Sequence, residues 1–189
     1  MLLYSRERFV ELTMKVGPLV NEMQRNDPTV IPSAVNWLIE VERVYTQLRN
    51  PAAAAVAVER GKILAALAGV APSPPGGHSR SSRKNATFVA FKAVEETNGA
   101  LRGQIADADR RIEAAKEKMV QLVAVASAKV PIPLPPSEPR DAWLDGVWKA
   151  MNTVAEVSGM CRYLGASLTS LDRRQILDDV LTQMIEAMG

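Results

Sequence analysis

The feature that most constrains this chain is an apolar seam through its middle. From Phe91 to Ala126, apolar or small residues recur at alternating spacings of three and four, with Asn98 as the polar exception. This alternation places one face of an α-helix against a neighbour over about five heptad repeats. The seam predicts one helix from Asn85 to Lys129, roughly 65 Å long at about 1.5 Å per residue. The spacing leaves open whether the helix is continuous at Asn98 and the glycine after it.

Helical periodicity also dominates the rest of the chain, and strand signals are nearly absent. Ser5, Asn50 and Ser170 are the expected N-caps, and Gly69 is the expected left-handed C-cap. The expected helices lie at 6–23, kinked or split at Gly17-Pro18, and at 32–48, 51–68, 140–164 and 171–188.

These helices predict an all-α fold. The expected architecture is an elongated bundle of about five or six helices, one of them long and heptad-patterned. Shifts in composition divide the chain into five segments. They are a three-helix lobe at 1–70, a basic Pro/Gly/Ser linker at 71–84, the long helix at 85–130, a Pro-rich linker at 131–139 and a C-terminal helical pair at 140–189 that packs on the long helix.

Composition also bounds the compartment. The chain has 189 residues, 47% of them hydrophobic, which is enough for a substantial core. A single cysteine, Cys161, excludes an internal disulfide and predicts a reducing, cytoplasmic location. The N-terminus has no long apolar stretch typical of a secretory signal. The longest apolar run is interrupted by Glu59, Arg60 and Lys62, so no membrane partner is expected.

No combination of residues indicates catalysis. His78 is the only histidine, so a His-pair metal site is impossible. Cys161 lies on the apolar face of an expected helix, where an inert thiol is usual. Nucleotide-binding glycine motifs are absent. The acidic groups that could hold a divalent metal are interleaved with Arg and Lys, which favours a solvated face: Asp107 with Asp109 and Glu113, and Asp178 with Asp179. We therefore expect no enzyme, no cofactor, no metal and no small-molecule substrate.

One stretch of the chain is basic and free of acidic residues. Between Arg60 and Val94 there are six basic residues and no Asp or Glu. Such a surface attracts phosphates without reading sequence. Phe88 and Phe91 could stack on bases, although their spacing favours a place in the core. The alternative is that "SRSSRK" is a solvated loop or a docking site for an acidic partner. The candidate nucleic-acid-binding residues are Arg60, Lys62, Arg80, Arg83, Lys84 and Lys92.

Two tryptophans are candidates for a protein interface. Trp143 and Trp148 are five residues apart on one expected helix, so they point in different directions. We do not expect one small bundle to bury both without a partner, and tryptophan is favoured at interface hot spots.

In size, helical content, scattered basic residues and lack of a catalytic motif, the chain resembles the small all-helical subunits of CRISPR ribonucleoprotein effector complexes. The segments that carry the likeness are "SRSSRK" and "ERGK", and no family residue is carried over. The resemblance implies an antiviral-defence subunit that stacks beside other subunits or copies of itself and contacts an RNA or single-stranded DNA backbone non-specifically.

Two functions follow from the sequence. The leading hypothesis is a non-catalytic helical subunit of a nucleoprotein complex, with nucleic acid on its basic surface and neighbouring subunits on its apolar helix faces. The alternative is a helical scaffold or adaptor that binds only another protein.

Overall fold

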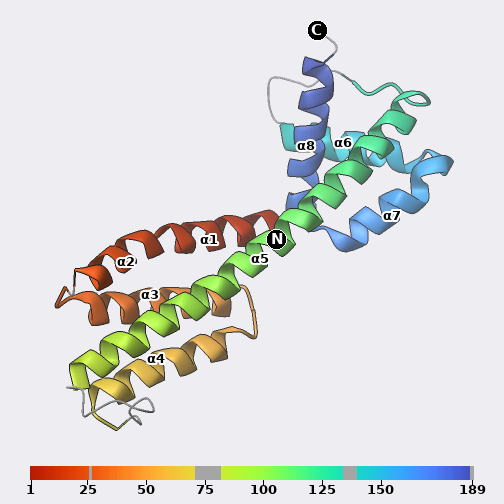
Figure 1. The fold of residues 1–189 in the computed structure, drawn as a ribbon. Coiled ribbons are helices and arrows are strands. Elements are labelled where there is room, and N and C mark those ends of the chain that lie inside the picture. The colour runs from red at the N-terminus through yellow and green to blue at the C-terminus, as the bar shows by residue number, and fades with distance from the viewer. Residues whose placement is uncertain (26, 71–81, 134–139, 188–189) are drawn as a thin grey trace. The chain divides into compact units, whose positions relative to one another are not determined.

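The computed structural model describes residues 1–25, 27–70, 82–133 and 140–187, and the regular elements among them are all helical (Figure 1). The predicted all-α class and the long helix are confirmed. No helix in this part of the chain is long and apolar enough to cross a membrane. The elements are α1 (Leu2–Met14), α2 (Val16–Gln24), α3 (Val30–Gln47), α4 (Ala53–Leu67), α5 (Ser82–Ser127), α6 (Arg140–Asn152), the short 3-10 helix η1 (Ala155–Val157), α7 (Ser158–Ser167) and α8 (Ser170–Glu186).

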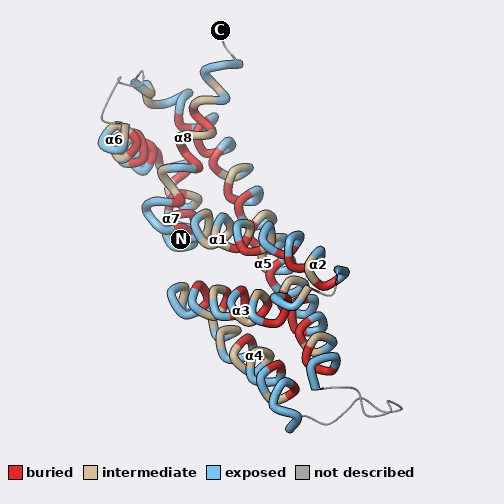
Figure 2. Tube along the Cα trace, turned by 90° about the vertical axis from the view of Figure 1, so that its left-hand side faces the viewer, coloured by how far each residue is buried: buried red, intermediate tan, exposed pale blue. Residues whose placement is uncertain are grey.

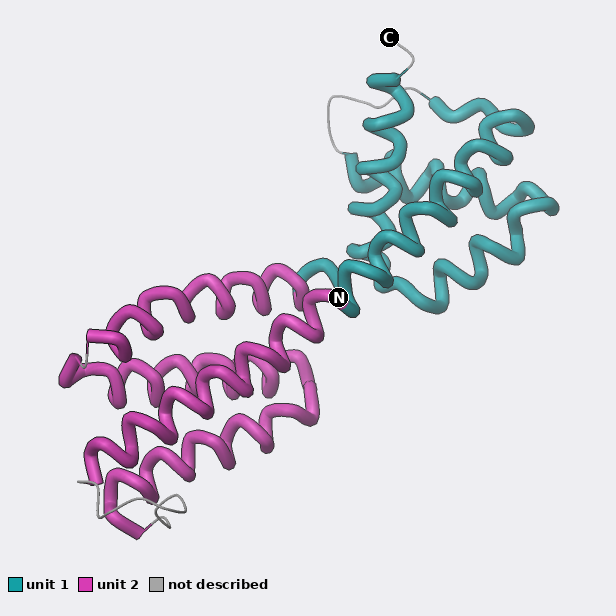
Figure 3. Tube along the Cα trace, in the orientation of Figure 1, with its two compact units in different colours: residues 1–4, 107–189 teal, residues 5–106 magenta. Residues whose placement is uncertain are grey.

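The helices group into two compact units (Figure 3). Unit 2 comprises Ser5–Ala106, and unit 1 comprises Met1–Tyr4 with Asp107–Gly189. The boundary lies within α5, which is helical without a break through Asn98 and Gly99. The predicted segment 85–130 is therefore divided between the units, and neither predicted linker marks the division.

Unit 2 has a core built from α1 to α4 and the first half of α5, and the buried stretches of these helices are red in Figure 2. The ring of Phe9 meets that of Tyr45 edge-on at 5.6 Å between centroids. Trp37 is buried, and its indole Nε1 donates a hydrogen bond of 3.0 Å to the carbonyl oxygen of Leu12. That bond satisfies a backbone acceptor close to the end of α1.

The division of the first expected helix occurs just before Gly17-Pro18. Pro18 has no backbone N–H, so the carbonyl of Met14, four residues earlier, loses its helical donor. The chain turns at Lys15, whose N–H bonds the carbonyl of Leu12 at 3.3 Å, and α2 begins at Val16. The proline thus breaks the helix one turn ahead of its own position.

Left-handed turns end both α3 and α4. The predicted C-cap Gly69 has φ +72°, and the N–H groups of Gly69 and Val70 bond back to Ala66 at 3.2 Å and Ala65 at 2.9 Å. The pattern is a Schellman motif, as the sequence predicts. Arg49 occupies the same position after α3 with φ 53°, a conformation that glycine adopts more readily.

Asn50 lies directly after this turn and leads the chain into α4. Its side-chain Oδ1 accepts a hydrogen bond of 3.0 Å from the N–H of Ala52. Its Nδ2 donates a bond of 3.0 Å to Gln104 of α5. The N-cap position of α4 is Ala52 and the helix begins at Ala53, so Asn50 stabilises the turn that precedes α4 and is not its N-cap as predicted.

Unit 1 has its own core, formed by the second half of α5 with α6, α7 and α8. The single helix predicted at 140–164 is wrong, because α6 ends at Asn152 and α7 starts at Ser158. Asn152 and Thr153 bind the carbonyls of Trp148 at 2.8 Å and Ala150 at 2.7 Å through their side chains. Such bonds compete with helix continuation. Val154 is extended and buried beyond the break.

The other two predicted N-caps are also wrong. Thr169, not Ser170, caps α8, and its Oγ1 accepts a bond of 3.2 Å from the N–H of Asp172. Ser5 lies inside α1, which already begins at Leu2. The reason is a carboxylate from another helix: Asp172 accepts hydrogen bonds from the N–H groups of Leu2 at 2.8 Å and Leu3 at 3.0 Å.

Asp172 is almost completely buried, with 3% of its surface exposed. Burial alone would raise the pKa of its carboxyl. The opposing hydrogen bonds from Thr169, Leu2, Leu3 and the Met1 ammonium outweigh burial and hold the pKa below its usual value. Because the charged form is favoured in the folded protein, Asp172 stabilises unit 1 above the ordinary carboxyl pKa. This contribution is lost as the pH falls through the lowered folded-state pKa.

Replacing Asp172 by Asn tests this account. At pH 7 we expect Asp172→Asn to lower the free energy of unfolding by about 1–3 kcal/mol, since buried N–H donors lose a charged acceptor. The difference from the unmodified protein should shrink as the pH is lowered below the ordinary aspartate value of 3.8. Urea denaturation at a series of pH values measures it. Asp178→Asn, on the same helix but partly exposed, is the control with the smaller effect. A difference that does not change with pH would contradict the assignment.

Candidate functional site

The basic residues predicted to bind nucleic acid are largely paired with carboxylates in unit 2. Arg60 Nη2 lies 3.0 Å from Glu42 Oε2, so an acidic residue of α3 reaches across to α4. Lys62 Nζ lies 2.6 Å from Glu59 Oε1, and this hydrogen bond raises the pKa of Lys62. Arg60 and Lys62 therefore offer less uncompensated positive charge to a phosphate backbone than the sequence indicates.

The other predicted basic residues lie near the start of α5. Lys92 Nζ is 3.6 Å from Glu96 Oε1, one helical turn along. Arg83 and Lys84 are exposed in the first turn, which contains no acidic residue. Arg80 lies outside the described residues. The structure thus brings Lys62 and Lys92 to a common surface and directs Arg60 towards α3.

That common surface is a groove between α4 and α5, with a volume of about 510 Å³. Its walls combine apolar side chains with the two Lys–Glu pairs. The residues that line it are Glu59, Lys62 and Ala65 of α4, Val70, and Phe88, Val89, Lys92 and Glu96 of α5. Phe88 is 49% exposed and Val70 is 79% exposed, so the groove presents apolar side chains to solvent.

The exposure of Phe88 and Phe91 corrects the expectation that they belong to the core; Phe91 is 43% exposed. The buried face of α5 in this half is made of smaller side chains. Its fully buried positions include Ala86, Ala90 and Ala93. Alanines let the helix approach its neighbours closely, so the heptad seam passes through Ala90 and leaves Phe91 at its edge.

A second hollow of about 180 Å³ adjoins the groove and shares Glu59 and Glu96 with it. It is lined mainly by small side chains of α4 and α5, which do not fill the space between the helices. Its other residues are Tyr45, Ala52, Ala55, Val56, Thr97 and Ala100. We call the groove and this hollow together the α4–α5 groove. Along α5 it runs from Phe88 to Ala100, roughly 18 Å at about 1.5 Å per residue.

Tyr45 is the most unusual residue of the α4–α5 groove. It is 1% exposed, and its hydroxyl has no hydrogen-bond partner among the described residues. Burial raises the pKa of the Tyr45 hydroxyl to about 12, so the group stays protonated at neutral pH. A buried hydroxyl without a partner costs free energy. Because the hydroxyl oxygen is itself buried, it can donate only to a ligand group that displaces the side chains covering it.

The sequence did not indicate Tyr45, Thr97 or Val70 as site residues. The one signal for the hollow is the alanine-rich run "AAAAVAVERGKILAALA". It predicts a helix with too little side-chain volume to fill its surroundings. Which side of that helix stays open depends on where α3 and α5 pack, and the run itself does not contain that information.

The two tryptophans differ in their surroundings. Trp148 is buried in the unit 1 core at 9% exposure, with the guanidinium of Arg173 4.7 Å from the centre of its ring. Little of the Trp148 ring is therefore exposed in this unit, and its role at a protein interface stays a prediction. Trp143 is half-buried, and its Nε1 donates a bond of 3.1 Å to the carbonyl oxygen of Pro133.

No group of three or more metal-binding side chains gathers in the part of the chain that the structure describes. Three of the five acidic residues considered as metal ligands form ion pairs: Asp107 with Arg110 at 3.0 Å, Asp178 with Arg140 at 2.5 Å and Asp179 with Lys116 at 3.5 Å. Cys161 is buried as expected, and burial raises the pKa of its thiol. His78 lies outside the described residues.

Comparisons with known proteins add no assignment: no protein-family model, no curated protein and no solved structure matches the chain.

Substitution of Tyr45 tests whether its buried hydroxyl lacks a hydrogen-bond partner. We expect Tyr45→Phe to leave the free energy of unfolding unchanged or to raise it by up to about 1 kcal/mol, because a buried hydroxyl without a partner is removed. Urea denaturation measures the change. Trp37→Phe, which removes a satisfied buried donor, is the control and should destabilise the protein. A clear loss of stability in Tyr45→Phe would mean that the hydroxyl is already satisfied.

Proposed function

We propose that this protein is a non-catalytic helical adaptor whose α4–α5 groove binds an amphipathic helix of a partner protein. The observation that carries the proposal is the exposed ring of Phe88 in a groove that continues into a hollow with the unpartnered Tyr45 hydroxyl. Large exposed apolar surface rimmed by charge is typical of protein-interaction sites.

The shape of the α4–α5 groove favours a helix over other ligands. Two helices form its walls, and a length of roughly 18 Å accommodates about three turns of a third helix. In this recognition mode the ligand inserts apolar anchors at i, i+3 or i+4 and i+7. Phe88, Val70 and Val89 would contact those anchors.

The charges define the rest of the partner's chemistry. Glu59 with Lys62 and Glu96 with Lys92 lie midway along the groove, one pair on each wall. Because each wall carries both signs, the partner helix needs no strong net charge there. At the far end, Tyr45 favours a partner side chain that accepts a hydrogen bond, such as Asn or Gln.

A displayed library of helical peptides of about 12–15 residues, selected on the purified full chain, tests the groove. We expect enrichment of sequences with helically spaced apolar residues. Phe88→Ala should weaken the selected peptides by about tenfold or more, as truncation of a buried aromatic anchor does. The matched control is Ile39→Ala, which truncates a side chain that is 45% exposed on α3 of the same unit.

Two results would overturn the adaptor proposal. One is a selected set without helical periodicity. The other is equal binding to the Phe88→Ala and Ile39→Ala variants, which would mean that the peptides bind elsewhere. Tyr45→Phe gives a finer readout, because it should weaken only those peptides that carry a hydrogen-bond acceptor.

A second candidate is the nucleoprotein subunit, of the kind found in CRISPR effector complexes. The observation that favours it is the exposed pair Arg83 and Lys84 in an α5 first turn without acidic residues. These residues would contact an RNA or single-stranded DNA backbone beside neighbouring subunits. The cytoplasmic location belongs to the same proposal, since a reducing compartment suits the free Cys161.

Fluorescence anisotropy with labelled single-stranded RNA and DNA, at low and moderate salt, tests this candidate. If the protein is a nucleoprotein subunit, we expect binding that weakens steeply as the salt concentration rises. This binding should be lost when Arg80, Arg83 and Lys84 are all replaced by Glu. Replacement of Arg43, Arg102 and Lys149 by Glu changes the net charge equally and is the control. Equal losses in both variants would reduce the effect to net charge, and no binding at low salt would leave the adaptor as the better account.

A further inference from the structure

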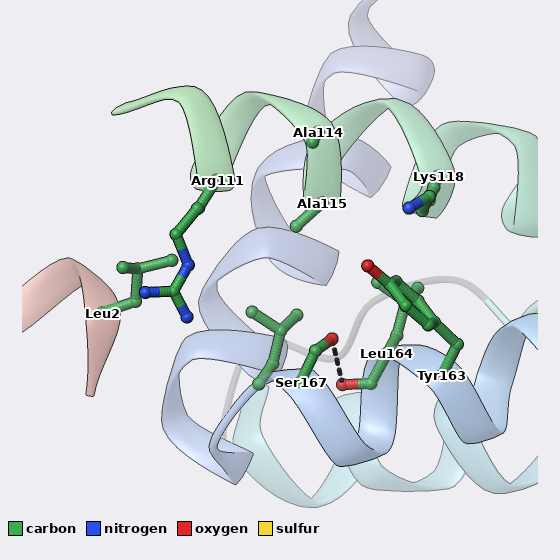
Figure 4. Close-up of a pocket in the computed structure, with 9 residues that line it drawn as sticks. Leu2, Arg111, Ala114, Ala115, Lys118, Tyr163, Leu164 and Ser167 are labelled. Carbon is green, nitrogen blue, oxygen red and sulfur yellow. Dashed lines mark hydrogen bonds between the residues drawn. The ribbon is translucent and has the colours of Figure 1, made fainter. Parts of the chain in front are cut away.

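A second, smaller cavity lies in unit 1, between α5 and α7, and has a volume of about 110 Å³ (Figure 4). It is distinct from the α4–α5 groove in residues and chemistry. Arg111 and Lys118 line it from α5, and Tyr163 and Ser167 line it from α7. Leu2 of α1, Leu164 of α7 and Leu168 directly after α7 also line it.

The spacing along α5 explains how the cavity forms. Arg111 and Lys118 are seven residues apart, so they lie on one helix face about 10 Å from each other along the axis. Between them are Ala114 and Ala115, whose small side chains leave the space open (Figure 4). On α7, Tyr163 and Ser167 are four residues apart and share the opposing face.

The charge in this cavity is of one sign. Neither Arg111 nor Lys118 forms an ion pair with a carboxylate of the described residues, and no acidic residue lines the cavity. Their neighbours on the same helix are paired, Arg110 with Asp107 and Lys116 with Asp179. Lys118 instead places its Nζ 4.1 Å from the centre of the Tyr163 ring. A cation–π contact holds the ammonium at the cavity without neutralising it.

We propose that this cavity binds a phosphate group. The Arg111 guanidinium can donate two parallel hydrogen bonds to phosphate oxygens, and the Lys118 ammonium adds a second charge. The hydroxyls of Tyr163 and Ser167 supply further donors. Ser167 now donates a long bond of 3.4 Å to the carbonyl oxygen of Leu164, which a phosphate oxygen would readily replace. The cavity has room for one tetrahedral oxyanion or a few water molecules.

Nuclear magnetic resonance of the full chain, labelled with nitrogen-15 and titrated with inorganic phosphate, tests the proposal. Sodium chloride at equal ionic strength is the reference. We expect saturable shifts of the amide signals at 111–118 and 163–168. Arg111→Gln and Lys118→Gln should each weaken binding by about tenfold or more, as the loss of a charge-assisted hydrogen bond does. Arg110→Gln, which lies outside the cavity, should leave binding unchanged.

Two phosphate esters distinguish a phosphomonoester ligand from a phosphodiester backbone. Methyl phosphate that binds as well as inorganic phosphate, with dimethyl phosphate clearly weaker, would assign the cavity to phosphomonoesters. Equal binding of dimethyl phosphate would assign it to a phosphodiester backbone. Tyr163→Phe keeps the ring beneath Lys118 and removes only the hydroxyl. The loss of phosphate affinity in this variant therefore measures the contribution of the hydroxyl donor alone.

The proposal is overturned if phosphate causes no saturable shifts beyond those in chloride. It is also overturned if Arg111→Gln and Lys118→Gln bind phosphate as the unmodified protein does. Since these side chains lie outside the core, both variants should stay folded, and their spectra in chloride verify it. The outcome is independent of the α4–α5 groove, whose test uses different residues of unit 2.

Discussion

Small side chains along α4 and α5 determine where the helices pack closely and where a groove or cavity remains between them. Ala86, Ala90 and Ala93 are completely buried, so α5 packs closely against its neighbours in unit 2 at these positions, and the larger Val94 and Leu101 are buried further along the same helix. The displaced Phe88 then lies in the groove. In unit 1, Ala114 and Ala115 leave the phosphate-sized cavity open between two cations. Small side chains thus line both candidate sites: Ala65 in the groove, and Ala114 and Ala115 in the cavity.

Ion pairing, within helices and between them, gives the two candidate sites different chemistry. The stretch without acidic residues lost much of its free charge, because Glu42, Glu59 and Glu96 from outside it pair with Arg60, Lys62 and Lys92. Conversely, Arg111 and Lys118 come from a stretch rich in acidic residues and face no carboxylate across their cavity. Charge counted along the sequence is thus a poor guide to charge at a surface. This argument favours an apolar ligand in unit 2 and an anionic ligand in unit 1.

Local signals predicted those features that local physics controls. The 3-4 spacing predicted α5, and Gly69 predicted the end of α4, since the seam and the left-handed turn each depend on neighbouring residues. Predictions were wrong where a distant group intervened. Asp172 caps α1 from α8, so α1 begins before Ser5. Of the residues in the α4–α5 groove, Lys62 and Lys92 were predicted to bind nucleic acid, whereas Tyr45 and Thr97 were not predicted because their role depends on burial.

By itself, the sequence determined the all-α class, the long central helix, the division near Gly17-Pro18 and the left-handed end of α4, because periodicity, proline and glycine act within a few residues. Only the tertiary structure decided which faces of those helices stay open. Burial and ion pairing join residues far apart in the chain, such as Tyr45 with Thr97 in one hollow and Arg111 with Ser167 in another. Such groupings depend on how closely helices pack, and that distance is set by the volumes of all the contacting side chains together.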